Sequence, residues 1–450
     1  MSSFDTIVIP SSPHYWLQGA RVPACFLATQ IPGAVADADG AQLVDIEIAD
    51  GRIAAIAPAG QQAPEGVPAV ALGNRQVWPT LVDMHAHLDK AHVIPRVMPD
   101  GTFTGGRVGT VADRRFWSHD DLRRRMGFAL RCAYVHGVSA VRTHLDSFEE
   151  LADRSWEVFR DVRAEWADRI TLQGVALVSL DMFRGDYGVK LADLVARSGG
   201  LLGAVTRAMG KDHVGTLEDT DALLDTLLRL AAERGLDVDL HVDESADLTA
   251  FSLPHVAQAV MRNRFGGTVT CSHCINLALQ PDDVARRTIE LCAASGIAVA
   301  TMPTPMMYLQ DRAPGRTPRW RGVTLVHELR AAGIPVAIGG DNCRDTWYAY
   351  GDHDVLDTLQ QSVRIFHLDH PFGDAPAMVG AIAARIMREP SIGSIAVGGP
   401  ARLILFGART LNELMCRPQS DRIVINRGVR VRDKLPDYAE LDADAVEALR

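Results

Sequence analysis

Between residues 77 and 341 the chain alternates short, apolar, β-branched runs with longer amphipathic stretches. The short runs have the length of strands, and the longer stretches have the period of helices. Strands that alternate with helices pair in parallel, because each helix returns the chain across the sheet. Eight such strands favour an α/β fold built as a closed (β/α)8 barrel, or TIM barrel, over an open sheet. The predicted strands are 77–85, 139–144, 171–177, 201–207, 237–242, 268–273, 297–302 and 335–341, and the predicted helices include 120–136, 220–234 and 282–294.

Both ends of the chain have a different, β-rich pattern. Residues 43–48 and 52–56 alternate in hydrophobicity on either side of Asp50-Gly51, a pair typical of hairpin turns. Strand-like runs return at 402–406, 422–426 and 428–431. We therefore expect the two ends to build one small composite β-sandwich. The predicted domains are 1–78 and 391–450 as the two parts of this sandwich, and 79–390 as the barrel.

Composition excludes several classes of protein. The net charge of -10 argues against a nucleic-acid partner. Seven cysteines, an odd number spread thinly, do not indicate a disulfide framework. No secretory signal opens the chain, and no apolar run has membrane-spanning length. The sequence predicts a cytoplasmic protein that binds neither nucleic acid nor membrane.

Five of the predicted strands end in His, Asp or Glu. In a parallel barrel these ends meet at one rim, where active sites lie. His85 and His87 follow the first strand, and alternate side chains of a strand share a face, so two imidazoles point the same way. Two such imidazoles are half of a transition-metal site. The other four strand ends carry His144 and Asp146, His241 and Glu244, His273, and Asp341.

These motifs carry a family resemblance. His85-Ala86-His87-Leu88-Asp89, Val141-Arg142-Thr143-His144-Leu145-Asp146, His241-Val242-Asp243-Glu244, Ser272-His273 and Asp341 with Trp347-Tyr348 occur in this order. Over about residues 45–430 the chain resembles the amidohydrolase superfamily, and within it the bacterial cytosine deaminase branch. The resemblance implies one divalent metal ion, zinc or iron, held by His85, His87, His241 and Asp341. It also implies that Glu244 and His273 flank the attacking water. The strand at 171–177 offers no lysine of the kind that two-metal members use as a bridge, which favours one metal.

Elementary chemistry gives these residues the same roles. A metal ion lowers the pKa of its bound water to about 7, so that hydroxide forms at neutral pH. Asp341 can accept the proton of that water, and His273 can stabilise the developing tetrahedral centre. Glu244 can carry a proton to a ring nitrogen and then to the departing amine. The predicted catalytic residues are therefore Glu244, His273 and Asp341.

Two positions depart from the cytosine deaminase pattern. Ser179 stands near the end of the third strand, where those enzymes carry a glutamine, and Asn342 replaces the acid that follows the metal-binding aspartate. A serine cannot make the bidentate contact of an amide, so a ring other than cytosine is indicated. Trp347 can stack on a planar heterocycle, and Lys90 can bind an anionic or carbonyl-bearing substrate, although a solvated lysine is an equal alternative. The predicted substrate-binding residues are Ser179, Asn342, Trp347 and Lys90.

The resulting hypothesis is a hydrolase of carbon–nitrogen bonds other than peptide bonds. It removes an amino or alkylamino group from a cytosine-like, pyrimidine or triazine ring by means of a metal-activated hydroxide. Hydrolysis of a cyclic or acyclic amide by the same residues is an alternative. A third alternative is a non-catalytic scaffold barrel, which the retained ligand set disfavours. The resemblance also favours a homo-oligomer.

Overall fold

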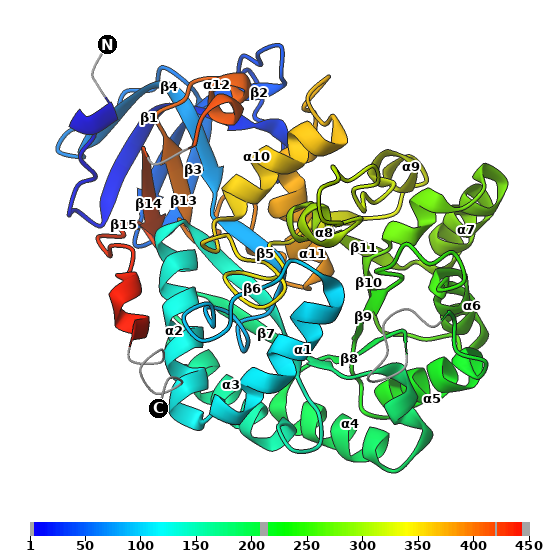
Figure 1. Cartoon of the computed structure of the whole chain (residues 1–450). Helices are drawn as coiled ribbons and strands as arrows, with labels where there is room; N and C mark the ends of the chain where they lie inside the picture. Colours follow the sequence, from blue (N-terminus) through cyan, green and yellow to red (C-terminus); the bar gives the residue numbers. More distant parts are fainter. Residues whose placement is uncertain (1–3, 208–214, 419–420, 443–450) are drawn as a thin grey trace. The chain divides into compact units, whose positions relative to one another are not determined.

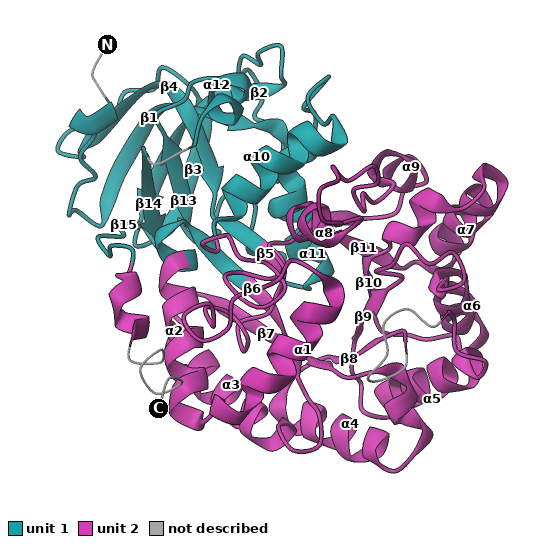
Figure 2. Cartoon of the chain, in the orientation of Figure 1, with its two compact units in different colours: residues 1–82, 133–140, 354–435 teal, residues 83–132, 141–353, 436–450 magenta. Residues whose placement is uncertain are grey.

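The computed structural model describes residues 4–207, 215–418 and 421–442 of an α/β chain with mixed parallel and antiparallel sheets (Figure 1). The chain divides into two compact units (Figure 2). The first holds residues 1–82, 133–140 and 354–435, and the second holds residues 83–132, 141–353 and 436–450.

One seven-stranded sheet forms the centre of the first unit, in the order β15-β14-β13-β4-β1-β2-β3. Strand β4 is parallel to β1 on one side and antiparallel to β13 on the other. Strands from the two ends of the chain therefore share a single sheet. The strands are β1 (His14–Pro23), β2 (Ala41–Ala49), β3 (Arg52–Pro58), β4 (Ala69–Pro79), β13 (Leu403–Phe406), β14 (Arg422–Asn426) and β15 (Val429–Arg430). The helices are η1 (Phe4–Thr6), η2 (Ala24–Phe26), α10 (Val355–Phe366), η6 (Ala375–Val379), α11 (Ala381–Ile386) and α12 (Leu411–Cys416).

The predicted hairpin is confirmed. Strands β2 and β3 pair antiparallel, and the turn between them has positive φ at both Asp50 (49°) and Gly51 (75°). A two-residue turn of this kind matches the twist of the flanking strands, and Asp-Gly tolerates its left-handed backbone.

Strands β5–β12 make two further sheets. One has the order β5-β6-β7, and the other has the order β12-β11-β10-β9-β8 with all its neighbours parallel. Isolated parallel bridges join Val175 to Leu201 and Ala86 to Asp341. The first links β7 to the residue before β8, and the second links β5 to the segment after β12. The strands are β5 (Leu81–Ala86), β6 (Val138–Asp146), β7 (Thr171–Leu177), β8 (Leu202–Val205), β9 (Val238–Val242), β10 (Val269–His273), β11 (Ala298–Thr301) and β12 (Val336–Ile338).

The prediction of one strand over 77–85 is wrong. Strand β4 ends at Pro79, where it pairs with Leu403, and β5 begins at Leu81. The N–H of Thr80 donates to the Arg402 carbonyl, and that of Leu81 donates to the Gly137 carbonyl. The chain changes sheets at Thr80, and the buried residues on both sides hide this change from hydrophobic patterning.

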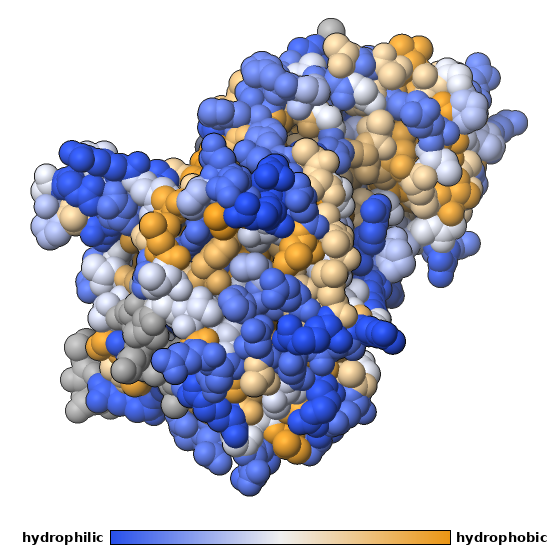
Figure 3. All heavy atoms as spheres, turned by 90° about the vertical axis from the view of Figure 1, so that its right-hand side faces the viewer, coloured by the Kyte–Doolittle hydropathy of each residue, from blue (hydrophilic) through white to orange (hydrophobic). Residues whose placement is uncertain are grey.

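Amphipathic helices follow the strands of the second unit. Helix α5 buries Leu223, Leu227 and Leu230 at helical spacing. Helices α5, α6 and α7 lie at the right of the second unit in Figure 1, and the face drawn in Figure 3 carries both hydrophilic and apolar side chains. The helices are α1 (Phe103–Asp113), η3 (Arg114–Phe116), α2 (His119–Val135), α3 (Ala152–Trp166), η4 (Leu180–Arg184), α4 (Tyr187–Ser198), α5 (Thr220–Glu233), α6 (Leu253–Arg262), η5 (Ile275–Leu279), α7 (Asp282–Ser295), α8 (Pro303–Leu309), α9 (Val326–Ala331) and η7 (Tyr438–Leu441). None of the helices in the described ranges has the length and apolar character needed to span a bilayer.

Candidate active site

The predicted metal ligands converge at the carboxyl ends of three strands. His85 is on β5, His87 follows it, His241 is on β9, and Asp341 follows β12. Asp341 Oδ1 lies 3.2 Å from His87 Nε2 and 3.6 Å from His85 Nε2. His241 Nε2 lies 3.4 Å from His87 Nε2. His273, at the end of β10, belongs to the same buried cluster, with its ring centroid 5.0 Å from that of His241.

A sharp turn brings Asp341 to this cluster. Its φ is 64°, and its N–H donates to the His85 carbonyl at 2.7 Å. A Cβ on the nearby Gly339 would lie 2.8 Å from the backbone nitrogen and Cβ of His85. Only glycine therefore lets the two segments approach this closely.

Buried polar atoms in the cluster are left unsatisfied. In the part of the chain that the structure describes, His85 Nε2, both ring nitrogens of His273 and both carboxylate oxygens of Asp341 have no hydrogen-bond partner. Each such atom costs about 1–3 kcal/mol when buried. Ligand atoms of His85, His87 and His241 lie within 4.8 Å of one another, as do those of His85, His273 and Asp341. This nitrogen and oxygen donor set fits a divalent ion such as zinc or iron.

The charge states of the cluster also suit a metal ion. Burial, followed by Lys90, lowers the pKa of His87 to about 4. Burial likewise holds the pKa values of His85, His241 and His273 well below the ordinary histidine value. The imidazoles are therefore neutral at neutral pH and present lone pairs. Burial raises the pKa of Asp341 to about 7.

A buried relay orients His85. Its Nδ1 lies 3.0 Å from Ser272 Oγ, which donates to Asp239 Oδ1 at 3.1 Å. Arg142 Nη1 donates to Asp239 Oδ2 at 2.8 Å. Such partners fix the tautomer and orientation of a metal-ligating imidazole. Sequence reasoning missed Asp239, although a charged residue between Val238 and Leu240 was the available signal.

His144 completes the interior of the cluster. Its ring stacks on that of His85, with centroids 3.9 Å apart. Its Nε2 lies 3.9 Å from Asp239 Oδ1. His144 therefore lies between the His85 ring and the Asp239 carboxylate.

Glu244 reaches the edge of the cluster. Its Oε2 lies 4.0 Å from His273 Nε2. Burial raises its pKa to about 8; Asp341 adds to the rise, while Arg207 and Lys90 oppose it. At neutral pH this carboxyl group is largely protonated and can donate a proton, as a general acid must.

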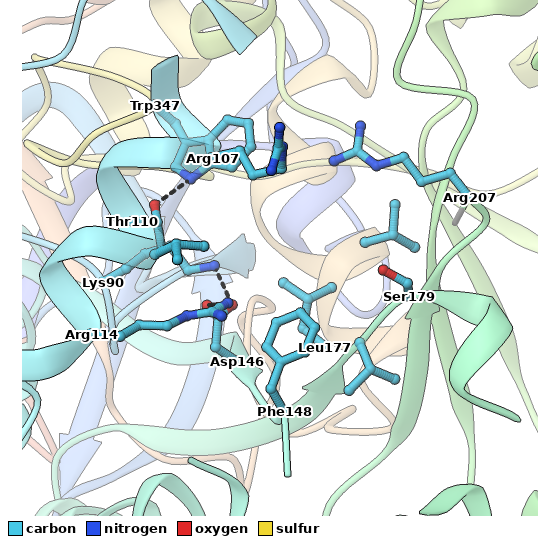
Figure 4. A pocket seen from close by; sticks show the side chains of 13 residues that line it. Lys90, Arg107, Thr110, Arg114, Asp146, Phe148, Leu177, Ser179, Arg207 and Trp347 are labelled. Atoms are coloured by element: carbon cyan, nitrogen blue, oxygen red, sulfur yellow. Dashed lines mark hydrogen bonds and ion pairs between the residues drawn. The ribbon is translucent and has the colours of Figure 1, made fainter. Parts of the chain in front are cut away.

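Among the cavities beside the cluster, two share lining residues. The smaller, of about 60 Å³, is lined by predicted ligands and by Glu244, His273 and Asn342. The larger, of about 220 Å³, is lined by Ser179 among others (Figure 4). Lys90 and Trp347 line both. All four predicted substrate-binding residues therefore lie beside these cavities.

Polar contacts hold the cavity residues in place. Lys90 is buried rather than solvated, and its Nζ donates to Asp146 Oδ1 at 2.6 Å. Trp347 Nε1 donates to Thr110 Oγ1 at 3.0 Å. Asn342 Nδ2 donates to Asp345 Oδ2 at 2.8 Å. These contacts present a fixed surface to a ligand.

Sequence reasoning also missed two arginines. Arg107 and Arg207 line the larger cavity from opposite sides in Figure 4. Arg207 is the last residue of the predicted strand 201–207 and lies two residues after the end of β8, so its rim position was the available signal. Arg107 is on α1, and nothing in the local pattern points to it.

Comparisons with known proteins agree with this geometry. The model of a family described as "Amidohydrolase family" matches residues 121–431. The chain is 47% identical over 443 residues to a pterin deaminase of Rhizobium rhizogenes, covering 98% of this chain and 99% of that protein. It is 25% identical to an N-isopropylammelide isopropyl amidohydrolase of Pseudomonas sp., covering 74% and 80%. The structure of 5-methylcytosine deaminase from Klebsiella pneumoniae with 5-fluorocytosine superposes with a TM-score of 0.78 at 25% identity, covering 94% and 98%.

Proposed function

Because this chain belongs to the amidohydrolase family and is a hydrolase of carbon–nitrogen bonds, we propose that its substrate is a pterin-like ring. Its class is that of metal-dependent deaminases of nitrogen heterocycles. A pterin carries an amino group on a pyrimidine ring that is fused to a second ring. The near-complete match to a pterin deaminase at 47% identity carries the proposal. The two adjoining cavities support it, because they share lining residues and together suit a two-ring planar ligand.

The proposed reaction replaces the exocyclic amino group with oxygen. Water adds to the ring carbon, the bond to the amino nitrogen breaks, and ammonia leaves. His85, His87, His241 and Asp341 would hold one zinc or iron ion, and the ion supplies Lewis-acid activation of water when bound. Asp341 accepts a proton from the water.

Two further residues act on the substrate in this proposal. Glu244 gives its proton to the ring nitrogen next to the reacting carbon, and a second transfer completes the departing ammonia. His273, 4.0 Å from Glu244, donates a hydrogen bond to the oxygen as the tetrahedral centre forms. Trp347 stacks on the ring, Ser179 and Asn342 read its polar edge, and Lys90 faces its carbonyl group.

We extend the proposal to the architecture. Strands β5–β12 form a closed (β/α)8 barrel, which is supported by the bridges at Val175–Leu201 and Ala86–Asp341. The sheet shared by the chain ends is part of a composite β-sandwich, with domain boundaries near residues 78 and 390. The protein is a homo-oligomer.

The test is ammonia release from a panel of amino-heterocycles by zinc-loaded and iron-loaded protein. The panel is pterin, isocytosine, cytosine and an aminotriazine. We expect pterin to be preferred over cytosine by about 10²-fold or more in kcat/KM, because mismatched polar edges are strongly rejected. Faster turnover of cytosine would refute the pterin assignment. Opening of a cyclic amide to a carboxylate, without ammonia, would move the assignment to amide hydrolysis.

A further inference from the structure

A second cluster of metal-ligating side chains lies outside the candidate active site. It consists of His92, in the segment after β5, and Cys343 and His353, between β12 and α10. The three residues are buried, with exposed fractions of 1%, 4% and 8%. One ring nitrogen of each histidine and the thiol sulfur lie within 4.8 Å of one another.

The spacing of the two imidazoles is that of a shared ion. His92 Nε2 lies 3.2 Å from His353 Nε2. Two nitrogens bound to zinc in tetrahedral geometry at about 2.05 Å lie about 3.3 Å apart. In the candidate active site, His87 Nε2 and His241 Nε2 are 3.4 Å apart. The second cluster thus repeats the nitrogen spacing of the first.

The surroundings favour neutral imidazoles with free lone pairs. Burial, then His353, Arg344 and Arg125, hold the pKa of His92 well below its ordinary value, so this imidazole is neutral. Two neutral imidazoles that face each other share at most one hydrogen bond, whereas a cation would engage both lone pairs. The backbone N–H of His353 donates a hydrogen bond to the Cys343 sulfur. Hydrogen bonds of this kind support metal-bound ligands.

We propose that His92, Cys343 and His353 bind one zinc ion at a site separate from the catalytic one. Two imidazoles with one thiolate form a softer donor set than the histidines and carboxylate of the active site, and such a set selects zinc among the abundant divalent metals. The negative thiolate and the nearby Asp352 offset the two arginines.

The site has a positioning role. His92 lies five residues after His87, and Cys343 lies two residues after Asp341. An ion held by both segments fixes the backbone that carries His85, His87 and Asp341. His92 and His353 have φ values of 61° and 54°, a costly backbone conformation that persists where surrounding contacts demand it.

The test measures the number of metal ions bound per chain and whether a sulfur atom binds one of them; it does not depend on enzymatic activity. Full-length protein is loaded with zinc or cobalt(II) and desalted, and metal per chain is measured. We expect two equivalents and a thiolate-to-cobalt charge-transfer band in the near ultraviolet. The predicted active-site ligands are all nitrogen or oxygen, so the band reports a thiolate outside that site, and the Cys343→Ser variant shows whether it is Cys343. The Cys343→Ser variant is expected to bind one equivalent without the band, whereas Cys292→Ser, at a buried cysteine of α7, keeps both.

Wild-type protein gives an independent check if Cys343→Ser fails to fold. X-ray absorption at the zinc edge is expected to show a sulfur scatterer at about 2.3 Å, at half occupancy per zinc. One equivalent of metal, with neither a sulfur scatterer nor a charge-transfer band, would overturn the proposal. That outcome would leave the deaminase assignment intact, since ammonia release is measured separately.

Discussion

At the scale of single residues, burial rather than residue type sets the chemistry of Glu244. The same side chain on a helix surface is an ordinary carboxylate, but here the pKa rises to about 8 and the proton stays on. Glu290, on the outer side of α7, is exposed and pairs with Arg286. The two residues therefore make a matched pair for testing the proton donor.

We expect Glu244→Gln to bind metal normally and to lose about 10²–10⁴-fold in kcat, because the amide cannot supply a proton. Metal content by elemental analysis and ammonia release by a coupled assay check this. Glu290→Gln is expected to keep full activity. Near-normal turnover by metal-loaded Glu244→Gln would exclude the proton-transfer role.

The pKa of Glu244 also predicts how activity depends on pH. The acid form of Glu244 exists below its pKa of about 8 and is lost as the pH rises through it. Activity is therefore expected to fall on the alkaline side. A bound cation favours the carboxylate and moves the limb to lower pH. The measurement is kcat/KM from pH 5 to 10 in wild type and Glu244→Gln; an alkaline limb of the same midpoint in both would assign it to another group.

Sequence reasoning reached the residues of the site that stand at strand ends. His85, His241 and Asp341 follow apolar runs, so topology alone predicts that they meet. Asp239 and the role of Ser272 in orienting His85 escaped because both residues lie inside strands, where their partners come from neighbouring strands. Long-range contacts of this kind leave little trace in a local pattern.

At the scale of elements, the backbone of neighbouring strands packs closely against Gly203 of β8. A Cβ at Gly203 would lie 2.4 Å from the Asp239 carbonyl oxygen and 2.6 Å from that of Ala176. Gly127, in α2, has open space around the same position and an ordinary helical backbone. One glycine is required by its neighbours and the other is not.

Gly203→Ala is expected to lower the free energy of unfolding by about 3 kcal/mol, because the backbone of β8 must shift to relieve the clash. Gly127→Ala is expected to raise it by about 0.5–1 kcal/mol through helix propensity. Denaturant unfolding of both variants measures the difference. Equal stabilities would show that β8 has room for a methyl group.

The positions of many strands and helices could be predicted from the sequence, whereas the point at which the chain passes from one sheet to another could not. Strands β7 and β9 and helices α2, α5 and α7 lie where periodicity predicts them. The run around Thr80 looked continuous because both of its halves are buried, in β4 and in β5. Which sheet a strand joins depends on partners such as Leu403, far away in the chain.

At the scale of the whole molecule, the metal is expected to contribute to stability. Within the described part of the chain, buried atoms of His85, His273 and Asp341 have no hydrogen-bond partner, and a bound ion would satisfy several of them. An ion that binds only the folded state stabilises it by about 4 kcal/mol at a thousand times its Kd. Chelation should therefore lower Tm, and zinc should restore it. A Tm that chelation leaves unchanged would contradict this reading of the buried cluster.

The sheet shared by the two ends of the chain has a consequence for synthesis. Strand β4 leaves the ribosome early, yet its partner on one side, β13, begins only at Leu403. Throughout translation of the intervening residues, that edge of β4 presents unpaired backbone groups, an open template for other chains. Nascent chains that stall before Leu403 should therefore associate with one another or with chaperones, whereas chains released after β15, when β13 and β14 are also paired, should not.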